Sequence, residues 1–215
     1  MHICYVAAQR RVLTSLLSLV VVGCTTMKVP ETKVQATESY QLKAEYEGLL
    51  VAAYPVTNKD EIEKSFRTDL LGNGILPVLI IAENRSSSTS FLIAKEKVAV
   101  VDQDSLRKTS ANREIPASDK GGESLLNIGG VLFSPVLLIA GSKMASDAQV
   151  INHNLADKAF YSRTVGPGQK VYGYVYFQLP QGSAAIERHH VLVEVSDAST
   201  GKTVTFDFPF SFNRR

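Results

Sequence analysis

Three tyrosines at alternate positions form the group of side chains most suited to binding chemistry. Tyr172, Tyr174 and Tyr176 lie in the stretch VYGYVYF at residues 171–177. Because successive side chains of a strand point to opposite faces, this spacing places the three rings in one row. Such a row could stack against a glycan or a peptide. The alternative is that the rings form the floor under a helical segment that precedes the strand, and we favour it because sequential elements usually pack together.

The histidines supply candidate metal ligands. His153 and Asp157 are four residues apart on a predicted helix, a spacing that suits two ligands on one face but equally an ordinary solvated pair. His189 and His190 are adjacent in a predicted strand, so they point to opposite faces and at most one could join a given site. Because no third ligand accompanies them, we predict no metal site and no bound cofactor.

Known catalytic motifs are missing from the sequence. It contains neither the G-x-S-x-G of a nucleophile elbow nor the H-E-x-x-H of a zinc hydrolase. Residues 201–203, Gly-Lys-Thr, match the end of a phosphate-binding loop, but a strand pattern follows them where a helix would be needed. We therefore expect a protein that is not an enzyme. The alternative is a hydrolase in which His189, Glu187 and Asp207 converge from neighbouring strands.

The strongest chemical signal surrounds Cys24. Arginines at 10 and 11 precede an apolar run of 11 residues (12–22), and the small Gly23 separates this run from the cysteine. The run is shorter than the about 20 apolar residues that cross a bilayer. This order of basic, apolar and small residues is typical of a secretory signal peptide, which we expect to comprise residues 1–23.

Residues 21–24, Val-Val-Gly-Cys, resemble the lipobox of bacterial lipoproteins with a type II signal peptide. The resemblance implies cleavage between Gly23 and Cys24 and a diacylglycerol linked to the Cys24 sulfur. In such lipoproteins an aspartate after the cysteine favours the inner membrane, whereas here Thr25 follows. The resemblance therefore implies a lipid-anchored protein of the cell envelope, with the outer membrane favoured.

Charge and composition restrict the partners. Hydrophobic residues make up 45% of the 215 and charged residues 20%, which is typical of a folded chain with a core. Cleavage before Cys24 would remove two of the 23 basic residues and none of the 21 acidic ones, leaving a formally neutral chain. Such a chain lacks the basic excess of a nucleic-acid-binding protein, and its membrane attachment must come from acyl chains. The expected partners are the membrane, through the lipid anchor, and another envelope protein.

Hydrophobic alternation predicts a domain built mainly of β-strands. Residues 24–45 are polar and lack a sustained apolar period, so we expect the lipidated cysteine to be followed by a flexible tether. Residues 46–215 contain several strand-like runs and form the predicted domain. The clearest runs are 171–178 and a hairpin made by 189–196 and 203–210.

Two helical segments interrupt this strand pattern. Residues 60–71 place apolar side chains four apart after a capping box that begins at Asn58. Residues 121–165 are interpreted as a helical insertion that contains the uncharged stretch 125–141 and an amphipathic helix over 147–160. The predicted fold class is an Ig-like antiparallel β-sandwich with a helical insertion, preceded by a signal peptide and tether.

Two stretches of the predicted domain, DLLGNGILPVLIIAENRS (69–86) and VGPGQKVYGYVYF (165–177), resemble uncharacterised bacterial envelope lipoproteins with an Ig-like domain. This resemblance implies a fold and a location but no activity. We therefore expect a lipid-anchored cell-envelope protein that acts as a non-enzymatic binding or scaffold module. The alternatives are the envelope hydrolase and a protein that inserts residues 125–141 into a membrane.

Overall fold

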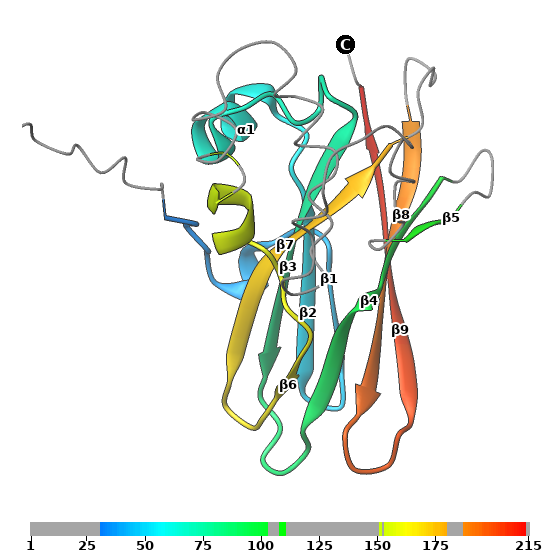
Figure 1. Cartoon of the computed structure of the whole chain (residues 1–215). Coiled ribbons are helices and arrows are strands. Elements are labelled where there is room, and N and C mark those ends of the chain that lie inside the picture. The colour runs from blue at the N-terminus through cyan, green and yellow to red at the C-terminus, as the bar shows by residue number, and fades with distance from the viewer. Residues whose placement is uncertain (1–30, 103–107, 111–150, 152, 180–186, 214–215) are drawn as a thin grey trace, which may run out of the picture.

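The computed structural model describes residues 31–102, 108–110, 151, 153–179 and 187–213, which form a sandwich of two antiparallel sheets (Figure 1). The first sheet has the order β1-β2-β3-β7, with strands β1 (Lys43–Tyr46), β2 (Leu49–Pro55), β3 (Ile75–Asn84) and β7 (Lys170–Gln178). The second has the order β5-β4-β8-β9, with strands β5 (Lys108–Ser110), β4 (Phe91–Asp102), β8 (Glu187–Asp197) and β9 (Thr203–Phe212), and β6 (Arg163–Val165) also pairs with β4. The predicted fold class, a mainly β antiparallel sandwich, is confirmed.

The C-terminal hairpin supplies one wall of the core. Val193 of β8 stands opposite Phe206 of β9, and Val191 stands opposite Phe208. All four side chains are buried against the first sheet. Because burying one phenylalanine contributes about 1.5–3 kcal/mol, the period-two alternation that predicted this hairpin is also what stabilises it.

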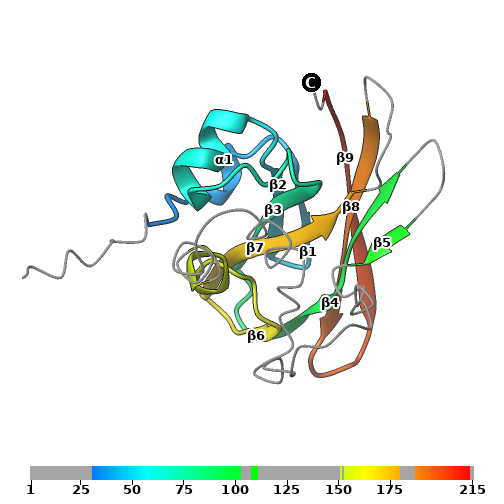
Figure 2. The same cartoon turned by 45° about the horizontal axis from the view of Figure 1, so that its top comes forward.

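Strand β3 is buried on both faces. Leu76 and Ile80 lie in the core between the sheets, whereas Leu79 and Ile81 belong to a second hydrophobic cluster on the outer face of the first sheet. That face is covered by two helical segments, which lie side by side in both views of the fold (Figure 1 and Figure 2). The sheet therefore has no solvent-facing side at its centre, which explains why β3 is a continuous apolar run.

Helix α1 (Lys59–Phe66) is the first of the covering segments. The Asn58 side chain accepts a hydrogen bond from the Glu61 N–H at 3.0 Å, as the capping box predicted. The helix ends earlier than the expected residue 71, because Arg67 adopts a left-handed conformation at φ 62°. A tight turn then leads into β3 and still buries Leu70 on the predicted apolar side.

The predicted tether over residues 24–45 is wrong for its C-terminal half. A 3₁₀ turn, η1 (Thr37–Ser39), and the start of β1 at Lys43 belong to the sandwich. Thr37 and Tyr40 are buried, and Val34 packs against the outer cluster. This segment is polar on average, but it packs on the sandwich because Val34, Thr37 and Tyr40 make buried contacts there. Residues 24–30 lie outside the described residues.

The predicted insertion over residues 121–165 is shorter at its C-terminal end. Residues 151 and 153–157 are helical and form the second covering segment, but β6 already belongs to the second sheet. The stretch 125–141, like all of 111–150, lies outside the described residues. Within the part of the chain that the structure describes, no helix is long and apolar enough to cross a membrane.

Candidate functional site

The structure divides the tyrosine row into a covered part and an exposed part. Tyr174 is 6% exposed and Tyr176 is half-buried, whereas Tyr172 is 48% exposed. The Phe66 ring of α1 contacts Tyr174 edge-on, with ring centroids 4.9 Å apart. The Tyr176 hydroxyl donates to the Leu155 carbonyl at 3.1 Å. Tyr176 therefore contacts the predicted insertion, as the floor interpretation expected, whereas Tyr174 packs under α1, which is not part of that insertion. A stacking platform of three rings is not formed.

Burial controls the acidity of the covered rings. Desolvation is the main cause that raises the pKa of Tyr174 and of Tyr176 well above the ordinary value for a phenol. Both rings are therefore neutral at physiological pH. They stabilise packing, and neither one is available as an anionic nucleophile or general base.

The exposed ring of Tyr172 lines a groove of about 620 Å³ on the outer side of β7. Tyr161, 44% exposed, lines it as well. We call this the tyrosine–arginine groove and define it by six of its lining residues, Glu31, Thr32, Lys158, Tyr161, Arg163 and Tyr172. Sequence analysis missed Tyr161 and Arg163, since they lie in irregular chain and at the start of a short strand, where no periodicity marks a face.

The groove has more positive than negative groups. Its cations are Lys158, Arg163 and Lys170, and its carboxylates are Glu31 and Asp157. The Arg163 Nε donates to the Tyr161 carbonyl at 3.3 Å, and both residues line the groove. Burial lowers the pKa of Lys158, whose Nζ lies 3.4 Å from the Thr32 hydroxyl. Aromatic rings beside cations suit the binding of an amphipathic or anionic partner.

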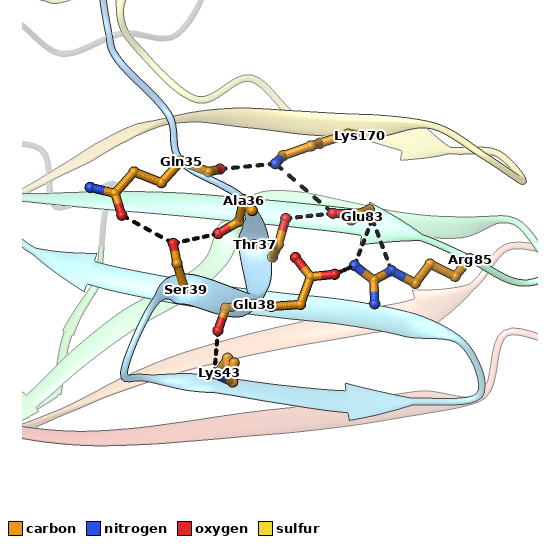
Figure 3. Close-up of polar contacts among 9 residues, drawn as sticks. All are labelled: Gln35, Ala36, Thr37, Glu38, Ser39, Lys43, Glu83, Arg85 and Lys170. Atoms are coloured by element: carbon orange, nitrogen blue, oxygen red, sulfur yellow. Dashed lines mark hydrogen bonds and ion pairs between the residues drawn. The ribbon is translucent and has the colours of Figure 1, made fainter.

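Close to the groove, a polar network fastens the N-terminal segment to the first sheet (Figure 3). Glu83 of β3 is its centre. The Thr37 hydroxyl donates to Glu83 Oε2 at 2.6 Å, and Arg85 Nε donates to Glu83 Oε1 at 2.8 Å. Arg85 also pairs with Glu38, and Lys170 Nζ donates to the Gln35 carbonyl at 3.1 Å. This network fixes where the chain enters the domain, beside the groove.

Replacing Thr37 with valine should loosen the N-terminal segment. Thr37 is fully buried, and a hydrogen bond to a charged acceptor contributes about 1.5–3 kcal/mol, so we expect a loss of that size. Hydrogen exchange should rise selectively over residues 31–42. Ser39→Ala is the matched control, because the Ser39 hydroxyl is exposed and should change stability little. Equal exchange in both variants would show that the bond to Glu83 does not hold the segment.

A second groove, of about 570 Å³, lies beside α1 and β2. The Tyr54 hydroxyl donates to Glu61 Oε2 at 2.9 Å, and the Tyr40 ring lies 5.9 Å from the Tyr54 ring. Burial, together with the Glu61 carboxylate, raises the pKa of Tyr54 to about 12. The hydrogen bond between Tyr54 and Glu61 joins β2 to α1, so these two polar groups already satisfy one another.

The hydrolase hypothesis built on His189, Glu187 and Asp207 is wrong about the geometry. His189 is 3% exposed and packs beside the Phe210 and Phe212 rings, with centroids 5.5 Å and 5.6 Å away. Asp207 lies on the opposite face of the sheet, where its Oδ1 is 2.7 Å from His190 Nδ1. The cause is strand parity, because residues 189 and 207 take opposite faces in the observed register.

The remaining histidine candidate is a surface ion pair. His153 Nε2 lies 3.3 Å from Asp157 Oδ2, four residues further along the helical segment, and both side chains are largely exposed. Among the described residues, no group of three or more histidine, cysteine, aspartate or glutamate side chains is arranged to hold a metal ion. Cys24 and Gly23, the predicted lipidation and cleavage residues, lie outside the described residues.

Comparison with known proteins finds solved structures of low sequence identity. No protein-family model and no curated protein matches the chain. A crystal structure from Bordetella pertussis, described as the ApaA protein, shares 10% identity at a TM-score of 0.36 and covers 81% of this chain and 96% of that chain. An X-ray structure of the structural-genomics target SoR45 shares 7% identity at a TM-score of 0.32 and covers 79% and 89%. Neither similarity carries a functional argument.

Proposed function

We propose that this chain is a lipid-anchored protein of the bacterial cell envelope whose sandwich acts as a non-enzymatic binding or scaffold module. One observation carries the proposal: two arginines, an 11-residue apolar run, Gly23 and Cys24 follow one another in the order that a lipoprotein signal requires. Thr25 after the cysteine favours the outer membrane. The expected partners are the membrane and an envelope protein.

The candidate sites within the domain are consistent with binding. His189 packs beside two phenylalanine rings, and the Tyr54 hydroxyl is already hydrogen-bonded to Glu61. The tyrosine–arginine groove presents exposed rings and a cation instead of a nucleophile beside a base. This composition suits the binding of a partner better than the conversion of a substrate.

Replacing Cys24 with serine should abolish lipidation. The thiol is the group that would receive the diacylglycerol, and cleavage of the signal would follow that transfer. Metabolic labelling with a fatty acid should therefore mark the parent protein and leave Cys24→Ser unmarked, with the variant accumulating as a longer precursor. Cys4→Ser is the matched control and should be labelled like the parent, because Cys4 lies in the segment that is removed. Equal labelling of parent and Cys24→Ser would contradict the proposal.

A further inference from the structure

We propose that the tyrosine–arginine groove rests on the lipid head groups of the membrane that carries the anchor. This inference rests on the proposed lipidation of Cys24 and adds which face of the domain meets the membrane. It follows from where the chain enters the domain and from the chemistry of the side chains at that point.

The length of chain between the anchor and the domain limits the distance. Glu31 and Thr32 line the groove itself, and only seven residue steps separate Cys24 from Glu31. At about 3.3–3.6 Å per step, even a fully extended connection spans no more than about 25 Å. A lipid on Cys24 therefore keeps the groove within about 25 Å of the anchor. The network around Glu83 holds this entry point in place.

The exposed side chains of the groove suit a lipid–water interface. Tyr172 and Tyr161 have the largest exposed fractions among the large hydrophobic residues that the structure describes as exposed. Tyrosine rings are enriched at the head-group level of membranes, where the ring is partly buried and the hydroxyl stays hydrated. An arginine beside them can extend its charge to a phosphate while its stem covers apolar surface.

The charges favour contact with anionic lipids only when the domain is already tethered. The groove is lined by three cations, Lys158, Arg163 and Lys170, and by two carboxylates, Glu31 and Asp157, an excess of a single positive charge. His153 lies beside Asp157, and Glu83 lies 3.9 Å from Lys170, so part of each sign is already paired. Such a surface binds vesicles weakly from solution, but a short tether raises its effective concentration at the membrane. The far side of the sandwich, at edge strand β9, has no comparable constraint.

The test uses the full chain in a Cys4→Ser background, purified with its anchor and placed in phosphatidylethanolamine–phosphatidylglycerol vesicles that contain a head-group quencher. A fluorophore is attached either to Tyr172→Cys in the groove or to Thr205→Cys, an exposed position on β9 at the opposite edge of the second sheet from β5 and β6. We expect the label at 172 to lose most of its fluorescence and the label at 205 to keep most of it. Adding Arg163→Glu to Tyr172→Cys should restore part of the loss.

Each other outcome overturns a defined part of the proposal. Equal quenching at both positions, or stronger quenching at 205, would show that the groove does not face the membrane. A label at 172 that stays bright with lipid but is dimmed by an added glycan or peptide would assign the groove to that ligand instead. Labelling of the Cys4→Ser chain, whose remaining cysteine is Cys24, would mean that the sulfur is free and that the anchor itself is wrong.

Discussion

Replacing Phe66 with alanine is expected to destabilise the domain by about 3–5 kcal/mol, the usual range for removing a buried phenylalanine. Phe66 is fully buried at the end of α1, where its ring touches Tyr174 at 4.9 Å and Tyr176 at 6.0 Å between centroids. Chemical denaturation should show this loss as a lower midpoint. Phe66→Leu is the control, and it should cost less because it keeps most of the volume and the apolar character of the site.

Phe66→Ala should also change the pH at which the covered tyrosines, Tyr174 and Tyr176, ionise. Their pKa values are raised by burial, so the native state keeps both rings neutral above pH 10, where the unfolded chain loses their protons. The stability that these rings contribute is therefore present below about pH 10 and is lost as the pH rises further. The chain contains no tryptophan, so absorbance near 295 nm follows the tyrosines directly. In Phe66→Ala some tyrosines should ionise closer to pH 10. An unchanged titration would mean that Phe66 does not cover them.

Replacing Gly173 with valine should cost at least the upper end of the about 1–3 kcal/mol typical of overpacking. A Cβ at residue 173 would lie 2.6 Å from Phe160 Cα and 2.7 Å from Phe160 N, which are backbone atoms that cannot rotate away. The clash would break two hydrogen bonds of 2.8 Å that join residues 158–160 to β7. In one, the Phe160 N–H donates to the Tyr174 carbonyl, and in the other the Tyr174 N–H donates to the Lys158 carbonyl. Strand propensity predicts the opposite sign, because valine normally favours a strand over glycine.

Thermal unfolding separates these two expectations for Gly173. Gly168→Ala is the control. Gly168 has φ +72°, and no atom of the described residues lies within 4 Å of where its Cβ would stand, so the cost there is conformational only. We expect Gly173→Val to lower the melting temperature clearly more than Gly168→Ala. A Gly173→Val protein as stable as the parent would show that the segment 158–160 can move away from β7 without loss.

Local patterns in the sequence determined the strands and the cap of α1. The alternation in residues 171–178, 189–196 and 203–210 predicts strands because period two places every second side chain on one face, and only one packing direction then buries the apolar set. Asn58 capped α1 as predicted, because a cap depends on residues three positions apart. Neither inference needs knowledge of what lies across the core.

Only the tertiary structure decided which exposed positions come together. Tyr172, Tyr174 and Tyr176 share one face, yet two helical segments stop short of Tyr172, so one ring of the row reaches solvent. The pairing of β8 with β9 placed Asp207 beside His190, because a register depends on which residue faces which across two strands. The N-terminal segment likewise joined the domain through Glu83, a residue remote in sequence. Sequence periodicity describes one element at a time, whereas a site forms from contacts between elements, and these depend on where each element ends.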